Sequence, residues 1–445
     1  ELEDRMIKYI RTIVFVFCVL LGSRGETVVV DITKGVMKPI NVALNLYDAT
    51  DTLEANFLTV ISNDLQRTFL FRILPQGAAM QRLRGIDKKP TYSIWKLINA
   101  QYLANAELEI NGDKLRVSLV LYDILSEAPV GTLSASGSIK DWRKLAHIMA
   151  NSIYERITGE VGYFDTKILY VALQKQPRGG KTYRLAMMDQ DGHDYKYLTN
   201  GNTVVLTPRF SPSGKEFSYF SYREKILNGR RIPLSAGVYR YSLSAKTTEL
   251  IANFKGMTYA PRYSPDGSSL IFSLSDRGSS SIYTFDLVTR RLTRLTKGRC
   301  IDTSPCYSPD GKRIVFNSDR GGTQQLYIMD ADGSNVRRLS FSAGRYATPV
   351  WSPRGDWIAF TKFGHSGFYI GIIHPDGTDE RMLASGYLVE GPTWSPNGRV
   401  IMFSHQDFAR REKIFSVDVT GYNKHEIATP HNAIDPEWSA KSRFQ

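Results

Sequence analysis

The 445-residue sequence has few of the side chains from which cofactor and metal sites are usually built. It contains three cysteines and seven histidines, and the histidines have no metal-ligand spacing. Cys300 and Cys306 stand close together, but they form neither a CxxC motif nor a disulfide framework. Two small buried thiols are the simpler interpretation, and a disulfide between them is the alternative.

Motifs of the common enzyme classes are also missing. The chain has no GxSxG nucleophile elbow, no HExxH motif, no P-loop and no GxGxxG after a strand. The stretch from Asp330 to Gly333 resembles the start of a calcium loop, but the bidentate acid that should close the loop is absent, so a turn explains it better. We therefore expect no enzymatic activity, no cofactor and no metal ion.

Long hydrophobic runs are absent as well. The most apolar segment, Thr12 to Leu21, is too short to cross a bilayer, which takes about 20 residues. It follows two basic residues and precedes the small residues Ser23 and Gly25, a pattern typical of a secretory signal peptide. We predict that residues 1–25 are a signal peptide cleaved between Gly25 and Glu26, so that the mature chain is exported. An uncleaved anchor is the alternative.

The overall composition is that of a globular protein. Hydrophobic residues make up 42% and charged residues 23% of the chain, which excludes disordered and collagen-like classes. The formal net charge of +13 suggests acidic partners. The Lys and Arg residues are scattered through turns and do not form a run, which argues against nucleic acid as a ligand.

One short motif occurs six times. Each copy is an aromatic residue followed by Ser, Pro, a variable residue and Gly, with a decayed last copy, and the serines are Ser211, Ser264, Ser308, Ser352, Ser395 and Ser439. Successive serines are 53, 44, 44, 43 and 44 residues apart, a period typical of propeller blades. Pro sets φ for the first turn position and Gly allows a positive φ beyond it, so each motif predicts a tight turn between two strands.

Runs of β-forming residues follow each motif, so each unit supplies four strands. The first unit lacks its innermost strand, while residues 436–439 form a lone strand near the other end of the chain. An isolated strand is not stable, so we predict that it completes the first blade and closes the ring. The predicted fold is an α/β N-terminal domain at residues 26–160 followed by an all-β six-bladed β-propeller at residues 161–445.

Residues 26–160 mix helical and strand periodicities. We predict a β-prone arm at 26–32, a strand at 41–46, an amphipathic helix at 53–69, a shorter helix at 94–103, a hairpin with an Asn111-Gly112 type I′ turn, a strand at 134–139 and a helix at 141–158 that ends at Gly159.

These features together resemble the TolB family of the Tol-Pal system. The matching residues are Glu26 to Asp31 in the arm, Leu121 to Asp123 in the hairpin, Trp142 with Ile157 to Gly159 in the last helix, and Ile168 to Val171 at the start of the propeller. The resemblance implies a non-enzymatic, periplasmic monomer whose propeller mouth binds the lipoprotein Pal and whose arm binds the C-terminal domain of TolA. Such a protein supports outer-membrane integrity and outer-membrane invagination during cell division, and colicin-type proteins use the same site in some relatives.

The loops that lead into the innermost strands ring one mouth of a propeller channel, so we expect partner contacts there. The predicted mouth residues are Met257, Thr258, Tyr259, Ala260, Asp302, Thr303, Ser304, Tyr346, Thr348 and Glu390. In the arm, strand addition to a partner sheet is expected from Glu26, Thr27, Val28, Val29, Val30, Asp31 and Ile32. A solvated loop ring and a permanently folded arm are the alternatives, as are a sugar-binding periplasmic propeller and an accessory propeller of a peptidase-like protein.

Overall fold

The structure is a computed structural model, and it describes residues 38–440 apart from six short gaps. These gaps are residues 47–51, 79–80, 177–179, 228–229, 255–257 and 365–366. Side chains are also left undescribed at 223–235 and 255–260. The predicted signal peptide and the predicted arm at 26–32 therefore lie outside the described residues.

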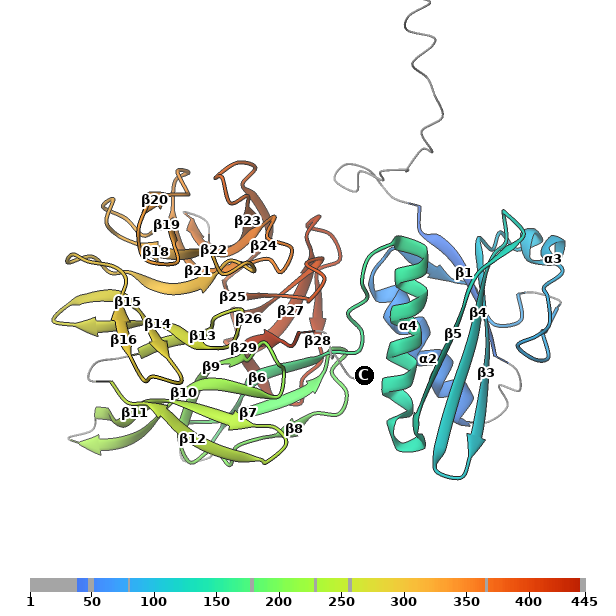
Figure 1. Cartoon of the computed structure of the whole chain (residues 1–445), viewed down its shortest axis with the longest axis horizontal. Helices are drawn as coiled ribbons and strands as arrows, with labels where there is room; N and C mark the ends of the chain where they lie inside the picture. The colour runs from blue at the N-terminus through green and yellow to red at the C-terminus, as the bar shows by residue number, and fades with distance from the viewer. Residues whose placement is uncertain are drawn as a thin grey trace, which may run out of the picture. The chain divides into compact units, whose positions relative to one another are not determined.

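A five-stranded sheet forms the first part of the described chain, in the order β2-β1-β3-β4-β5. Its strands are β1 (Ile40–Leu46), β2 (Phe71–Ile73), β3 (Tyr102–Asn111), β4 (Lys114–Asp123) and β5 (Ala128–Ser138). Strand β1 is parallel to both of its neighbours, and the remaining pairs are antiparallel. Helices α2 (Thr52–Arg67) and α4 (Trp142–Thr158) cover one face, and the short helix α3 (Tyr92–Leu97) lies beyond the other (Figure 1).

The helix faces follow the predicted apolar positions. Phe57, Ile61 and Leu65 of α2 are buried against the sheet together with Met149 and Ile153 of α4. Helix α4 ends at Gly159, whose φ of +74° is the left-handed conformation predicted for a helix-terminating glycine. An apolar stripe at helical spacing is therefore enough to place both long helices on the sheet.

Three local predictions for this part are wrong. The second helix is short, and Leu103, assigned to it from the sequence, belongs to β3, the central strand of the sheet. Phe69, expected on the buried face of α2, lies beyond the helix end and is exposed. The β3–β4 hairpin turns at Gly112-Asp113, because Asn111 pairs with Lys114. Gly112 has a positive φ and Asp113 does not, which fits a type II′ turn.

Six four-stranded sheets form the blades of a propeller. In chain order they are β9 to β12 (Val204–Phe210, Glu216–Leu227, Arg230–Ser242, Thr247–Ala252), β13 to β16 (Thr258–Tyr263, Ser269–Asp276, Ser279–Asp286, Leu292–Arg294), β17 to β20 (Thr303–Tyr307, Arg313–Ser318, Gln325–Asp330, Arg337–Arg338), β21 to β24 (Arg345–Trp351, Ile358–Gly364, Gly367–Ile373, Arg381–Gly386) and β25 to β28 (Leu388–Trp394, Val400–Gln406, Glu412–Asp418, His425–Ile427). The first blade, which the end of the chain completes, combines β29 (Asn432–Trp438) with β6 (Lys167–Lys175), β7 (Lys181–Asp189) and β8 (Lys196–Tyr197).

The repeated motif forms the turn between the first two strands of a blade, as predicted. In each of the five complete copies the Gly N–H donates to the Ser carbonyl at 2.9 Å, and the glycine φ lies between +67° and +79°. The serine side chains are buried, and Ser308 and Ser395 bond to the residue that follows the proline. Because consecutive strands of a blade are neighbours, these turns and the turns before the fourth strands share one face of the propeller.

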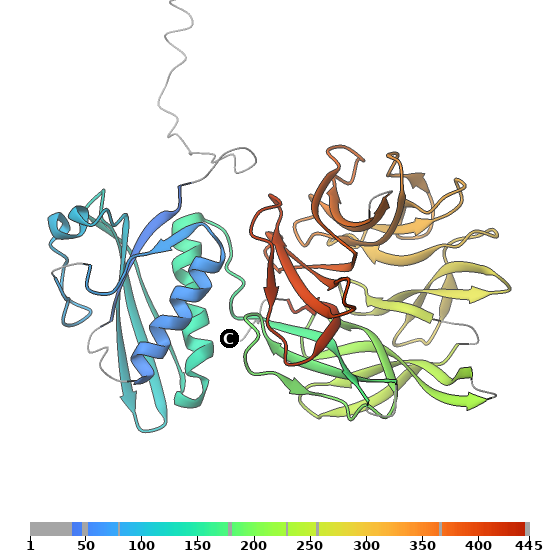
Figure 2. The ribbon, with the colours of Figure 1, turned by 180° about the vertical axis from the view of Figure 1, so that it is seen from behind.

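The lone C-terminal strand closes the ring, which confirms the prediction. Strand β29 pairs antiparallel with β6, from Asn432 opposite Leu173 to Trp438 opposite Ile168. Figure 2 shows the last strands of the chain, in red, beside the first propeller strands, in green. The Trp438 indole N–H donates to the Thr166 hydroxyl at 2.8 Å, and its ring packs edge-on against Tyr163.

The sheet part and the propeller share buried side chains. One apolar cluster contains Leu145 and Tyr154 of α4 as well as Ile168 of β6 and Trp438 of β29. Phe164, in the connection between α4 and β6, donates its N–H to the Asn151 side chain of α4 at 2.8 Å. The expected domain boundary at residue 160 stays a prediction, because the core continues across it.

Replacing Trp438 by Ala should lower the free energy of unfolding of the propeller by about 3–5 kcal/mol, since it removes a large buried ring from the closing strand. Urea denaturation followed by circular dichroism measures this. Tyr422→Ala is the control, because Tyr422 is 74% exposed and should change stability by less than about 0.5 kcal/mol. Equal losses in the two variants would show that the closing strand does not support the ring.

Candidate partner-binding mouth of the propeller

The innermost strand of every blade contains a β-bulge whose second residue is proline. The bulges fall where pairing skips two residues, at 207–208, 260–261, 304–305, 348–349, 391–392 and 435–436. The prolines are Pro208, Pro261, Pro305, Pro349, Pro392 and Pro436. Proline has no N–H to donate to a strand ladder, and a bulge is one of the few places where a sheet tolerates it.

The residue before the proline has a left-handed backbone in each of the five bulges in which this residue is fully described. Its φ is +47° at Thr207, +53° at Ser304, +46° at Thr348 and +51° at Asp435, and the fifth is Gly391. A β-branched threonine is rarely found in this conformation, which costs on the order of 1–3 kcal/mol. Strained backbone therefore recurs at the same position of the innermost strands around the ring.

The bulges have their own signal in the sequence, separate from the turn motif. Each aromatic residue of the main motif is preceded by a proline two positions earlier, as in TPRF, SPCY, TPVW and DPEW. In five of the six blades a second proline follows four residues later, and the pair predicts an innermost strand that is interrupted by a bulge and then ended by a turn.

Glu437 shows that the innermost strands surround a common axis. From β29, its carboxylate lies 3.6 Å from Arg209 of β9 and 3.9 Å from Arg262 of β13, and it accepts a hydrogen bond from the Thr393 hydroxyl of β25 at 3.2 Å. Four of the six innermost strands thus meet at one side chain. Burial and the nearby charge of Arg262 lower the pKa of Arg209.

Acidic side chains lie nearer the mouth. The Asp435 carboxylate accepts the Thr207 N–H at 3.1 Å. Partial burial and the charge of Asp435 raise the pKa of Glu390, one of the predicted mouth residues. The channel therefore presents both signs of charge: a carboxylate held between two guanidinium groups, and an acidic pair closer to the opening.

The structure separates the other predicted mouth residues into groups. Thr303, Ser304 and Thr348 are partly buried, and the Thr303 hydroxyl accepts from Asn317 at 2.8 Å. Met257 lies outside the described residues, and Thr258, Tyr259 and Ala260 belong to β13 but their side chains are not described.

Tyr346 and Asp302 are buried in this structure, in contrast to the expectation of exposed contact residues. Tyr346 is 0% exposed, and its hydroxyl donates to Glu380 at 2.7 Å beside the Lys362 ammonium. Both carboxylate oxygens of Asp302 accept from Arg320 at 3.0 Å. Their partners come from other strands and loops of the same blade, so both side chains support the fold in this conformation.

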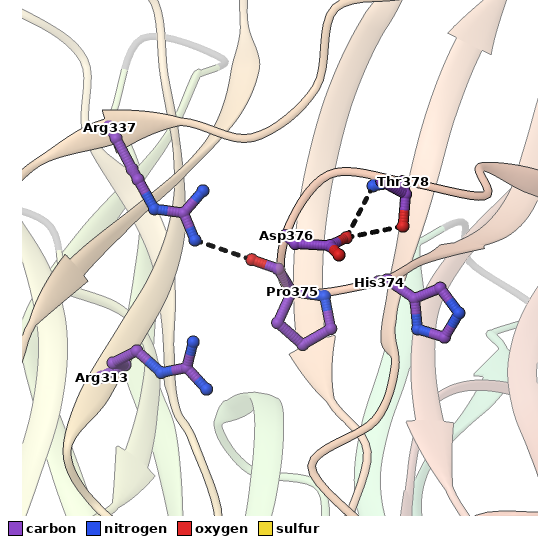
Figure 3. A pocket seen from close by; sticks show the side chains of 6 residues that line it. All are labelled: Arg313, Arg337, His374, Pro375, Asp376 and Thr378. Carbon is purple, nitrogen blue, oxygen red and sulfur yellow. Dashed lines mark hydrogen bonds between the residues drawn. The ribbon is translucent and has the colours of Figure 1, made fainter.

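A hollow of about 470 Å³ lies away from the mouth, between neighbouring blades (Figure 3). Arg337 donates to the Pro375 carbonyl at 2.8 Å, and the Asp376 carboxylate accepts both the N–H and the hydroxyl of Thr378. Arg313 stacks over the Trp351 ring. Most of the polar groups that line the hollow thus pair within the protein.

Three side chains of metal-ligand type, His147, Asp189 and Asp191, converge where α4 meets the propeller. Arg143 donates to Asp191 at 2.5 Å, and Lys167 pairs with Asp189. Cationic side chains therefore already neutralise both carboxylates, and the group is an ion-pair network. Cys300 and Cys306 are free thiols, but only Cys306 is buried and Cys300 is partly exposed, so the interpretation as two buried thiols is confirmed for Cys306 alone.

Two family models match the chain along most of its length. The model described as the TolB beta propeller domain matches residues 154–442, and the model described as the TolB amino-terminal domain matches residues 28–130. The chain belongs to the TolB family. It is 46% identical to the Tol-Pal system protein TolB of Rickettsia felis over 96% of this chain and 98% of the relative, and 47% identical to that of Rickettsia conorii over 92% and 94%.

A solved TolB structure agrees with this assignment. The crystal structure of TolB from Acinetobacter baumannii superposes with a TM-score of 0.80 at 26% identity, covering 92% of this chain and 98% of that one. The TolB fold predicted from the repeats is thus confirmed. As a TolB family member, the chain is a non-enzymatic, periplasmic component of the Tol-Pal system. No helix among the described residues is long and apolar enough to cross a membrane.

Replacing Tyr346 by Phe should lower the free energy of unfolding by about 1.5–3 kcal/mol, because it removes a hydrogen bond to the charged Glu380 in a buried setting. Urea denaturation measures the change. Tyr422→Phe, at an exposed position, should leave stability within about 0.5 kcal/mol of the original. A Tyr346→Phe variant as stable as the parent would assign the hydroxyl no structural role.

Proposed function

We propose that the chain links two components of the Tol-Pal system. The propeller mouth binds the lipoprotein Pal, and the N-terminal arm binds the C-terminal domain of TolA. Through these contacts the protein would maintain outer-membrane integrity and support outer-membrane invagination during division. We also propose that the signal peptide is cleaved between Gly25 and Glu26, which would leave the arm at the start of the exported chain.

The observation that supports Pal binding best is the closed channel with an accessible mouth. Thr303, Ser304, Thr348 and Glu390 are not fully buried and belong to innermost strands of three blades. Side chains that a closed ring of strands holds in place offer a preformed surface, and such surfaces bind a protein partner with little loss of conformational entropy.

Exposed aromatic side chains on the loops of the same face add to this support. Phe341 is 71% exposed and precedes β21. Tyr387 and Phe408 are 47% and 87% exposed, and their rings contact each other in a tilted arrangement with centroids 5.0 Å apart. Aromatic residues supply much of the binding energy in protein interfaces. The exposed Arg345 and Arg410 lie on the same face and would favour an acidic partner surface.

Replacing Thr303 by Arg should reduce Pal affinity by at least about tenfold, because a long charged side chain would obstruct the mouth. Calorimetric titration of the exported chain with the soluble domain of Pal measures this. Thr289→Arg is the matched control, since it places the same charge on an exposed turn of the opposite face and should leave affinity unchanged. No binding by the folded parent chain would remove the proposal.

Replacing Val29 by Pro should abolish TolA binding and leave Pal binding unchanged, because proline cannot donate a main-chain hydrogen bond to a partner strand. Calorimetry with each partner separates the two effects. If the arm also changes state when Pal occupies the mouth, hydrogen exchange at residues 26–33 should change on Pal addition. Unaltered TolA binding by the Val29→Pro variant would show that the arm does not act by strand addition.

A further inference from the structure

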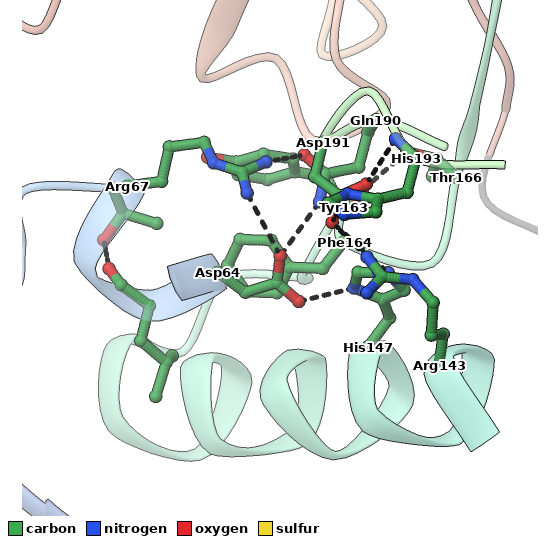
Figure 4. A network of polar contacts seen from close by, with 12 residues as sticks. Asp64, Arg67, Arg143, His147, Tyr163, Phe164, Thr166, Gln190, Asp191 and His193 are labelled. Carbon is green, nitrogen blue, oxygen red and sulfur yellow. Dashed lines mark hydrogen bonds and ion pairs between the residues drawn. The ribbon is translucent and has the colours of Figure 1, made fainter. Parts of the chain in front are cut away.

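A buried histidine lies between α4 and the first propeller blade (Figure 4). His147 of α4 is 3% exposed. Its Nδ1 lies 2.5 Å from the Asp64 carboxylate of α2, and Asp64 is 0% exposed. We call the contact region formed by Asp64, His147, Gln190 and Asp191 the seam, since it joins the sheet part to the turn that follows β7.

The other ring nitrogen has no hydrogen-bond partner. His147 Nε2 is buried, and the nearest acidic oxygen, Oδ2 of Asp191, lies 4.0 Å away. A neutral imidazole that donates from Nδ1 to Asp64 would direct the lone pair of Nε2 toward that second carboxylate, which is unfavourable in a site of low dielectric. A proton on Nε2 turns this repulsion into attraction. Two carboxylates on opposite sides of one ring therefore favour the imidazolium form.

Charged and titratable groups from every element packed at the seam face this ring or its immediate partners. They are Asp64 and Arg67 of α2, Arg143 and Lys144 of α4, Asp165 and Lys167 at the start of the propeller, and Asp189, Asp191 and His193 around the turn after β7. Gln190 connects the propeller to the sheet part, because its side chain donates to Asp64 at 3.0 Å and accepts from Arg67 at 2.7 Å.

We propose that a protonated His147 is a pH-sensitive lock that holds the sheet part onto the propeller. Loss of its proton would leave an acceptor nitrogen facing Asp191 and remove the ion pair with Asp64 across α2 and α4. Since Gln190 and Asp191 come from the propeller, the contact that weakens is the one between the two parts of the chain. The sheet part would then dock more loosely at higher pH.

The electrostatic balance at the ring agrees with this geometry. Burial lowers the pKa of His147, but the carboxylates of Asp64, Asp191 and Asp189 raise it by more, so the pKa lies above its ordinary value of about 6.5. A group whose pKa is raised on folding gives its full stabilisation below the ordinary pKa. That stabilisation is lost as the pH rises through the folded-state pKa. The contact between the sheet part and the propeller therefore weakens as the pH rises.

The test uses hydrogen exchange of the full chain, corrected for the intrinsic pH dependence of exchange, at the seam amides of Phe164 and Gln190. In the parent chain, protection should fall by up to about tenfold for each pH unit between the ordinary pKa of about 6.5 and the folded-state pKa of His147, and should level off above it. In His147→Gln the corrected protection should be lower at neutral pH and independent of pH. His193→Gln is the matched control, because His193 is 64% exposed beside the same Asp191 and should leave the parent profile unchanged.

Two outcomes would overturn the lock. One is a His147→Gln variant with the same pH profile as the parent; the other is a titration of the His147 ring, followed by NMR in the parent chain, with a midpoint below about 6.5. The NMR titration needs no variant, so it decides the question even if His147→Gln fails to fold. A stabilisation of the parent by added Zn²⁺ that His147→Gln lacks would show that a metal ion, not a proton, occupies the seam, and would also overturn it.

Discussion

The pairing of β29 with β6 is the constraint on which the rest of the structure depends. Without it the first blade would lack its innermost strand and the ring would keep two open edges. The same strand brings Glu437 to the side chains of three other innermost strands and buries Trp438 beside Tyr163. Ring closure, the wall of the channel and the docking of the sheet part are therefore consequences of seven residues near the end of the chain.

Turn chemistry explains why so much of the propeller could be predicted from the sequence. The Ser-Pro-x-Gly turns depend on φ preferences within four residues, so their pattern survives without knowledge of the fold. The closing strand followed from counting strands and from the instability of an open edge. Helix α4 followed from an apolar stripe that ends at a glycine. In each case the information lies within a short segment or in the number of segments.

The features that the sequence did not predict depend on partners distant in the chain. Tyr346 is buried because Glu380 accepts its hydroxyl, and a mouth position alone does not reveal that partner. Residue 103 belongs to β3 because β1 and β4 pair on either side of it, although its local pattern suits a helix. The seam combines residues 64, 147, 190 and 191 from two helices and a turn, and such a set has no spacing in sequence. Tertiary contacts decided all three.

The places where local preferences are broken lie along the innermost strands and at the seam. Gly391 shows that a bulge before proline can be built without side-chain strain, yet four of the equivalent positions carry side chains: Thr207, Ser304, Thr348 and Asp435. Part of the cost is offset locally, because Asp435 accepts the Thr207 N–H and the Thr348 hydroxyl bonds to Thr361. A buried Asp64–His147 pair is likewise more costly than an apolar contact of the same size. Neither feature is needed to close a propeller, so both are best explained by what the channel and the seam do once the ring is closed.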